Sequence, residues 1–507
     1  MRSRVAIVAS LMAVACGGAA PAAPEPVVPP PVPLTPIVTA PAPTGTPDAP
    51  FREHPPVSGS AVAFAPPRID TWTLPNGVEI LLVERHELPL VSVRVVLKVG
   101  AGDVTGQRPG VLSFLGAMLE QGTRRRSALE ISDAYEAIGA VHAAWVDWDS
   151  AGATVKVVTK ELPSALDLLS DVVLHPSFPQ PEIDRLKSRR LAGLAQEKND
   201  PGAMWSNAAA AALYGRAHPY GHSLLGQEED VPKISRDEIL RAYAATFSPR
   251  RAALVVAGDV TREAITEELA DTFGKWVAGP AAKLPPPKAP PPAEKDVPRV
   301  VIVDRPGAPQ SLVRLAEVGV PRTAPDRDAV TLMNTILGGM FASRINLNLR
   351  EAHAYTYGAR SSFQMRHGAG NFSAGGAMVA DKTAAAVHEL FAEVQAMRDR
   401  PVSAEELDGA KENLRLAMPG RFETVTDVTS AVADLFVYDL PLDEYATRSA
   451  RIDKLTAEDV QNAAKAHLHP AGLKVIVVGD RNGLTEQLEQ LHLGAVEARD
   501  PYGEIVR

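Results

Sequence analysis

The chain has 507 residues, of which 22% are charged and 45% are hydrophobic. A chain of this length and composition can bury more than one core, so fibrous and wholly disordered classes are excluded, and at about 100 to 200 residues per domain we expect at least two domains. The 52 Lys and Arg residues against 61 Asp and Glu residues give a formal net charge of -9 without a basic stripe, so nucleic acid is not an expected partner.

The N-terminus is typical of an exported bacterial lipoprotein. Arg2 and Arg4 precede a short apolar run at 5–15, and small residues lead into Cys16, the only cysteine of the chain. This arrangement resembles a lipobox, so we expect residues 1–16 to be a signal peptide and Cys16 to carry a lipid, with an ordinary secreted chain as the alternative. The lipid would be the only membrane contact and would hold the protein on the periplasmic side of the bacterial cell envelope, at the outer membrane.

A tether precedes the expected globular part. Residues 17–58 are rich in Pro and Ala and nearly uncharged, a composition that stays extended. Beyond them, apolar residues alternate in 78–84, 91–99 and 153–159, which predicts strands, and recur at three- and four-residue steps in 164–174, which predicts a helix. This pattern favours an α+β fold in which helices pack on one face of a mostly antiparallel sheet.

A second proline-rich run, at 280–298, divides the chain into two halves that repeat each other. SRDEILRAYAATFSPRRAALVVAGDV, from Ser235, aligns without a gap to TAEDVQNAAKAHLHPAGLKVIVVGDR, from Thr456. Each copy has a capping-box start, a helix, a proline break and an apolar strand that ends in Gly-Asp. We therefore predict two homologous modules that form a clamshell. The predicted boundaries are 59–279 for the first module, 280–298 for a linker, 299–495 for the second module and 496–507 for a tail.

Four stretches carry a resemblance to one protein family. They are GVLSFLGAMLEQGT (110–123), LHPSFPQPEIDRLKSRRL (174–191), HPYGHSLLG (218–226) and ILGGMFASRINLNLRE (336–351). With them, the chain resembles the pitrilysin and insulinase-like zinc peptidases over nearly all of its length after the tether. The resemblance implies a two-module fold and a site at which such peptidases cleave peptides with zinc.

The metal-binding motif of that family is degenerate in this chain. In the family, an inverted H-x-x-E-H on a helix supplies two zinc-binding histidines and a glutamate base, and a distant glutamate completes the site. The matching positions here are Ser113, Gly116, Ala117 and Gly193. Serine is a poor zinc ligand, and glycine and alanine have no donor atom, so we expect neither zinc nor a catalytic residue in this chain. Close helix packing by small residues is the expected use of the face formed by positions 113, 116 and 117, with a repurposed pocket as the alternative.

Other histidines do not offer a replacement site. His218 and His222 flank a Pro-Tyr-Gly turn, in which two rings need not converge on one metal ion. The histidines that we expect to be structural or surface groups are His142, His353, His467 and His469.

The second half keeps residues that the resemblance links to substrate binding. Arg350 and Tyr357 match the Arg/Tyr signature of the family, in which the subunit without the metal contributes both residues to a substrate held at its partner's zinc. A guanidinium can bind a peptide carbonyl or carboxylate, and a phenol can donate a hydrogen bond to the carbonyl. The structural alternatives are a helix C-terminal charge for Arg350 and a half-buried strand aromatic for Tyr357.

The sequence thus predicts a non-catalytic subunit of a zinc peptidase. This chain would pair with a zinc-bearing H-x-x-E-H homologue, which would supply the metal and the base, and would help to bind unfolded peptides for proteolysis. Two alternatives stay open: a stand-alone binding or scaffold lipoprotein of the same fold, and an active zinc peptidase with unrecognised ligands. The scaffold alternative predicts indifference to Arg350, whereas the last alternative lacks a convincing set of His and carboxylate ligands at helical spacing.

Overall fold

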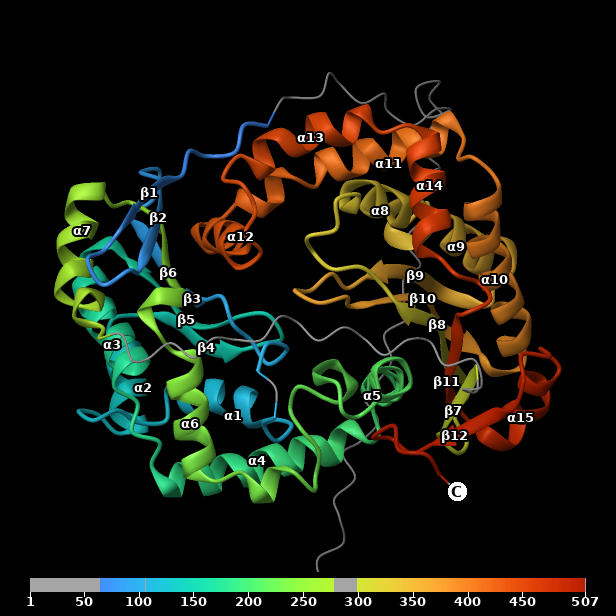
Figure 1. The fold of residues 1–507 in the computed structure, drawn as a ribbon, viewed down its shortest axis with the longest axis horizontal. Coiled ribbons are helices and arrows are strands. Elements are labelled where there is room, and N and C mark those ends of the chain that lie inside the picture. Colours follow the sequence, from blue (N-terminus) through green and yellow to red (C-terminus); the bar gives the residue numbers. More distant parts are fainter. Residues whose placement is uncertain (1–63, 105, 278–298, 507) are drawn as a thin grey trace, which may run out of the picture. The chain divides into compact units, whose positions relative to one another are not determined.

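The structure, a computed structural model, describes residues 64–104, 106–277 and 299–506. Cys16, the expected tether and the expected linker lie outside these residues. Within the described part, none of the helices combines the length and the apolar character that a membrane crossing requires. The predicted α+β fold with two homologous modules is confirmed, because each half of the chain folds around a six-stranded sheet with helices packed on it (Figure 1).

The two sheets share one strand order. In order across the first sheet the strands are β1 (Asp70–Thr73), β2 (Glu79–Glu84), β6 (Ala252–Gly258), β3 (Leu90–Leu97), β5 (Ala151–Val158) and β4 (Val141–Val146). Across the second sheet they are β12 (Val496–Arg499), β7 (Val300–Asp304), β11 (Lys474–Gly479), β8 (Gln310–Val318), β10 (Asn371–Val379) and β9 (Thr356–Phe363). Strands β2 and β6 pair in parallel, as β7 and β11 do, while the neighbours of β3 and β8 are antiparallel. The duplication seen in the sequence is therefore a duplication of topology.

The outer strands show where the copies differ. Strand β1 runs antiparallel to β2, whereas β12 runs parallel to β7 in the corresponding place. Strand β12 belongs to the segment that the sequence leaves as a tail, so part of that segment completes the second sheet. At the opposite edges, β4 and β9 each pair with one neighbour only.

Helices follow the strands in both halves. In the first half they are α1 (Val111–Met118), α2 (Ala128–Ala137), α3 (Leu162–Leu174), α4 (Gln180–Glu197), α5 (Pro201–Tyr214), α6 (Arg236–Thr246) and α7 (Arg262–Asp271). In the second half they are α8 (Arg327–Asn334), α9 (Arg344–Asn346), α10 (Thr383–Asp399), α11 (Ala404–Leu416), α12 (Val425–Val437), α13 (Glu444–Lys454), α14 (Ala457–His467) and α15 (Arg481–Glu489). Two π-helical segments, Thr335–Gly339 and Leu347–Ala352, follow α8 and α9.

The repeated helix starts are capped as the sequence predicts. At the start of α6, the Ser235 side chain accepts a hydrogen bond from the Glu238 amide (3.2 Å), and the Glu238 carboxylate accepts one from the Ser235 amide (2.8 Å). Thr456 and Asp459 make the same reciprocal pair at α14. Each box satisfies two backbone donors that a helix start leaves without partners, which fixes both helices at the same place relative to the strand that follows.

Each sheet is covered on both faces, and one of the covering helices comes from the other half. On the first sheet, Leu254 and Val256 of β6 face the core built with helices of the same half, whereas Ala253 and Val255 face α12. On the second sheet, α5 takes the matching place, and the indole of Trp205 donates to the carbonyl of Ile476 (3.2 Å). Figure 1 shows α12 beside β3 and β6, and α5 beside β11. The unbroken apolar sequence of β6 follows from this two-sided burial.

A largely buried ion cluster also joins the halves. His367, in the turn between β9 and β10, places Nδ1 3.2 Å from the carboxylate of Asp103 and donates its backbone N–H to Asp149 (3.1 Å). The ring Nε2 lies 2.9 Å from the carbonyl of Val437, and the Tyr438 hydroxyl donates to Asp149 (2.8 Å). Both ring nitrogens thus face acceptors, which is the environment of a protonated imidazole. We call these residues the His367 clasp.

Candidate functional site

Helix α1 carries three of the four degenerate metal positions. Gly110, with φ of 86°, precedes the helix, and Ser113 lies in its first turn with 8% of its surface exposed. The Ser113 hydroxyl faces the carbonyls of Leu224 (2.7 Å) and Gly110 (3.1 Å), and its oxygen accepts a hydrogen bond from Nη1 of Arg190 (3.0 Å). The serine is therefore committed to holding the helix start, the 222–226 loop and α4 together.

Gly116 allows α1 to approach strand β4. A Cβ atom at this position would lie 2.5 Å from the backbone nitrogen of Val146 and 2.7 Å from the carbonyl carbon of Trp145. Contacts this short with backbone atoms cannot be relieved by a side-chain rotation, so any other residue would push the helix and the strand apart. The interpretation of this face as close packing by small residues agrees with the geometry at Gly116.

The remaining two positions add no donor. Ala117 packs against the core of the first half, and Gly193 on α4 is exposed, so that a Cβ atom added there would meet open space. A zinc site needs three or four nitrogen, oxygen or sulfur ligands, and these four positions present one hydroxyl that is already engaged. The residues present do not fit a zinc ion.

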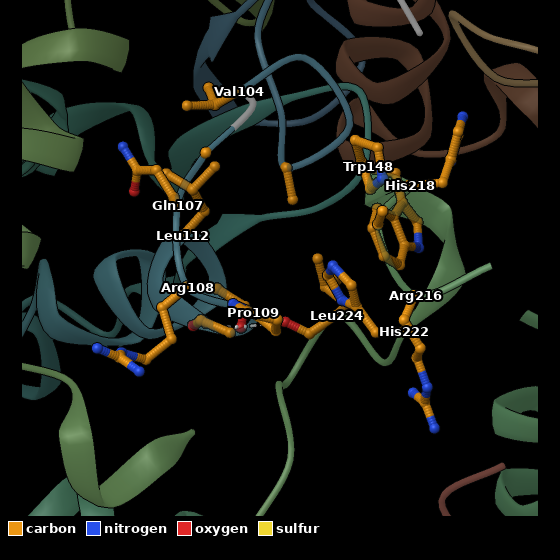
Figure 2. A pocket seen from close by; sticks show the side chains of 16 residues that line it. Val104, Gln107, Arg108, Pro109, Leu112, Trp148, Arg216, His218, His222 and Leu224 are labelled. Carbon is orange, nitrogen blue, oxygen red and sulfur yellow. Dashed lines mark hydrogen bonds between the residues drawn. The ribbon is translucent and has the colours of Figure 1, made fainter. Parts of the chain in front are cut away.

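A cavity of about 400 Å³ borders Ser113 (Figure 2). Arg108, Arg216, His218 and His222 are among its lining residues, and no carboxylate is. Arg108 pairs with Glu238 (3.2 Å) and Arg216 with Glu504 (2.7 Å), so both guanidinium groups already have partners. In Figure 2, Trp148 and His222 lie on one side of the cavity, and Gln107 and Leu112 lie on the other.

The two histidines of the HPYGH turn have separate environments. Pro219–Gly221 form a short 3-10 helix, and Nδ1 of the buried His218 accepts a hydrogen bond from the Tyr220 amide (3.0 Å). Nδ1 of His222 lies 3.1 Å from the Ser223 carbonyl, and burial lowers the pKa of His222. Among the described residues, no group of three or more His, Cys, Asp or Glu could hold a metal ion.

Of the four histidines that we expect to be structural or surface groups, three lie near one carboxylate each. His142 lies 2.7 Å from Glu120 and stacks on Tyr135 at 3.9 Å between ring centroids. His467 lies 2.6 Å from Asp326, and His469 lies 3.0 Å from Glu317. His353 lies 3.2 Å from the carbonyl of Asn348 instead. One carboxylate for each ring makes an ion pair or a hydrogen bond and not a metal site.

Arg350 lies in the π-helical segment Leu347–Ala352, and such segments recur at functional sites. Its guanidinium carbon is 4.7 Å from the centre of the Phe341 ring, and its Nε is 3.4 Å from Glu351. The side chain is 38% exposed, and Phe341, over whose ring the guanidinium lies, is 67% exposed as a residue. The guanidinium thus lies over an aromatic ring at the surface, and Arg350 is also the basic residue in the last turn of its segment, as the alternative of a helix C-terminal charge requires.

Tyr357 stands on the outer strand β9 and is 91% exposed. This corrects the structural alternative of a half-buried strand aromatic, because a side chain with this exposure contributes little to a core. The buried Asn346 connects the strand to the Arg350 segment: its amide donates to the carbonyl of Phe341 (2.8 Å), and its oxygen accepts from the amide of Ala359 (3.2 Å). Arg350 and Tyr357 are therefore carried by elements that one buried amide holds together.

The sequence gives little indication of two residues of the candidate sites, Asn346 and Arg190. Asn346 lies inside the quoted 336–351 stretch, but a polar residue in a helix-like pattern does not reveal that its amide bridges two backbones. Arg190 lies inside the quoted 174–191 stretch, one helical turn before Gly193, and a basic residue there is most simply interpreted as solvated. That turn spacing was the one available indication that its side chain lies near the degenerate site.

Comparison with known families and proteins gives consistent matches. The family model described as Insulinase (Peptidase family M16) matches residues 79–227, and the one described as Peptidase M16 inactive domain matches residues 233–414. An uncharacterized zinc protease of Streptomyces coelicolor is 28% identical over 57% of this chain and 63% of its own length. An uncharacterized zinc protease of Mycobacterium bovis is 25% identical over 85% of this chain and 98% of its own length. The non-peptidase homolog YmxG of Helicobacter pylori is 22% identical over 80% of this chain and 92% of its own length.

Solved structures resemble the described fold. A peptidase M16 inactive domain from Pseudomonas fluorescens is similar with a TM-score of 0.74 and 27% identity, over 81% of this chain and 98% of that chain. A protease from Helicobacter pylori has the same TM-score at 20% identity, over 82% of this chain and 99% of that chain. The second likeness concerns the fold alone.

Proposed function

Because this chain belongs to the M16 (insulinase-like) peptidase family, we propose that it is a non-catalytic subunit that binds peptide for a zinc-bearing homologue. The observation that carries the proposal is the contrast between its two halves. The metal positions of the first half hold no free donor, whereas the second half presents Arg350 and Tyr357 at its surface. A solved structure described as a peptidase M16 inactive domain and a relative named non-peptidase homolog support a chain without its own catalysis.

In this proposal the chain's own residues bind and orient the substrate. The Arg350 guanidinium donates to a peptide carbonyl or to a terminal carboxylate, and the Tyr357 hydroxyl donates to a neighbouring carbonyl. Asn346 is a positioning residue, because it fixes the helix and the strand that carry both groups. The partner subunit supplies the metal and the base, and the lipid at Cys16 keeps the pair at the envelope.

The test starts from the tagged full chain, purified from the native envelope. We expect a zinc-bearing H-x-x-E-H homologue to co-purify, the complex to cleave peptides, and the chain alone to hold no zinc and to cleave none. In the complex, Arg350→Ala is expected to lower kcat/KM about 100-fold, because it removes a charged donor to the substrate carbonyl. Tyr357→Phe is expected to lower kcat/KM about 10-fold, because it removes one neutral hydrogen bond. Arg360→Ala, which removes an exposed arginine from the same strand, is the matched control.

Each other outcome identifies a different function. Zinc-dependent hydrolysis by the chain alone would show an active peptidase with other ligands and would overturn the proposal. A chain that purifies alone, without metal, would instead be a binding or scaffold protein. A complex that is indifferent to Arg350→Ala and to Tyr357→Phe would keep the pairing but remove the assigned role of the two residues.

A further inference from the structure

The side chain of Arg190 occupies part of the degenerate metal site. Arg190 lies on α4 one turn before Gly193, and its Nη1 is 3.0 Å from Ser113 Oγ and 3.2 Å from the Gly110 carbonyl. The same nitrogen is 3.4 Å from the carbonyl of Leu225. Its guanidinium carbon lies 5.0 Å from the ring centre of Phe114, a fully buried residue of α1. The cation thus lies against α1 and the 222–226 loop, next to a position that holds a ligand in the family.

This cation has oxygen neighbours but no carboxylate of its own. Burial, together with nearby Arg189, lowers the pKa of Arg190 to about 10, and Glu197 counteracts this only in part. The group therefore still carries its charge at neutral pH. Over the described ranges, Arg190 forms no ion pair with an acidic side chain, and the acceptors around it are two carbonyls and one hydroxyl. A bound metal cation would need the same kind of surroundings, because carbonyl and hydroxyl oxygens stabilise a buried positive charge.

We propose that Arg190 is a built-in cation that replaces the metal ion in this chain and excludes metal from the site. The chain would then fail to bind the zinc of its family for two reasons. The ligands are missing, and a guanidinium fills the space between α1, α4 and the 222–226 loop. A divalent ion brought close to this charge would be repelled in a poorly solvated place. This inference does not depend on pairing with another subunit, because it concerns only contacts within the chain.

The test restores the three ligand positions in two backgrounds. The full chain with Ser113→His, Ala117→His and Gly193→Glu is prepared with Arg190 present and with Arg190→Leu, and binding of Zn²⁺ is measured by calorimetry and by metal content. We expect the Arg190→Leu form to bind one Zn²⁺ at least about 100-fold more tightly than the form that keeps Arg190. The matched control is Arg189→Leu in the same three-ligand background, which removes an exposed and therefore screened charge from the same helix and is expected to tighten Zn²⁺ binding less than about tenfold. Equal binding in both backgrounds, or binding in neither, would overturn the proposal.

A second measurement uses the otherwise unchanged chain, in case the three-ligand forms do not fold. Hydrogen exchange at the Leu225 and Gly226 amides is compared among the wild type, Arg190→Leu and Arg189→Leu. Because the guanidinium holds the Leu225 and Gly110 carbonyls together, Arg190→Leu should raise exchange at these amides about tenfold or more, while Arg189→Leu leaves it at the wild-type rate. Wild-type exchange in Arg190→Leu would show that the side chain does not close the site.

Discussion

The His367 clasp predicts a loss of stability in mildly alkaline solution. Burial is the largest single influence on the pKa of His367 and lowers it. The opposing influences outweigh burial and raise the pKa to about 9: they are the hydrogen bond to Asp103, the negative charges of Asp103 and Asp149, and the carbonyl of Val437. Two phenols also lie close to the ring. The Tyr438 ring contacts the His367 ring, and the Tyr220 hydroxyl accepts a hydrogen bond from the backbone N–H of Gly368, the residue after His367. Burial raises the pKa of both phenols, so they stay neutral over the range of interest.

The size and direction of the effect follow from the shift. The pKa of His367 rises from 6.5 to about 9, which at about 1.4 kcal/mol per unit corresponds to roughly 3 kcal/mol, and screening at the partly exposed ring reduces this to about 2 kcal/mol. A raised pKa means that the folded state holds the proton more tightly. The contribution is therefore complete below pH 6.5 and is lost as the pH rises through about 9. Burial raises the pKa of Asp149 as well, and this carboxylate is present in both proteins that the assay compares.

The assay is urea unfolding of the wild type and of His367→Gln at about pH 6 and about pH 9.5, on either side of the titration. The wild type should lose about 2 kcal/mol more unfolding free energy between these conditions than His367→Gln, which carries no charge to lose. His388→Gln, which removes a 77% exposed histidine, should behave like the wild type. An equal loss in the wild type and in His367→Gln would refute the assignment of the charge to the clasp.

Three backbone and packing changes test the rest of the structure by the same unfolding measurement. Ala354 has φ of 53°, a conformation that costs an alanine more than a glycine, so Ala354→Gly should raise the unfolding free energy by about 0.5 to 1 kcal/mol; a decrease would contradict the turn geometry. Gly116→Ala places a methyl group against the backbone of Val146 and should cost about 1 to 3 kcal/mol, whereas Gly193→Ala, which meets open space, should cost nothing. Trp205→Ala should cost about 3 to 5 kcal/mol, and a loss below about 1 kcal/mol would argue against α5 as the cover of the second sheet.

The duplicated fold could be predicted because its signals are local. The capping boxes at Ser235 and Thr456 and the apolar strands that follow them depend on residues only a few positions apart, and the structure confirms them. The exchange of α5 and α12 between the halves could not be predicted in the same way. A strand that is apolar on both faces shows that both faces are covered, but the pattern is the same whichever helix covers them.

For the candidate site, the positions of its residues could be predicted from the sequence, but their neighbours in space could not. Motif matching finds Ser113 and Gly193 by position, and residue chemistry alone predicts that neither replaces a metal ligand. It does not predict that a side chain from α4 lies beside Ser113, because a basic residue in an amphipathic helix usually extends into solvent. Nor does it predict the bridge made by Asn346, which depends on a strand that follows ten residues later.

The geometry of α1 separates metal binding from catalysis in any attempt to restore this site. The neighbours of position 113 are the Arg190 side chain and the 222–226 loop. A metal-binding side chain at 113 therefore has to displace only a side chain and a loop. Position 116, where the family has its base, lies against the backbone of β4, and a side chain at Gly116 has to displace a strand of the sheet. A form that regains zinc after the loss of Arg190 should therefore still lack a general base. In the proposed non-catalytic subunit, backbone packing at Gly116 would therefore prevent catalysis more firmly than the absence of metal ligands does.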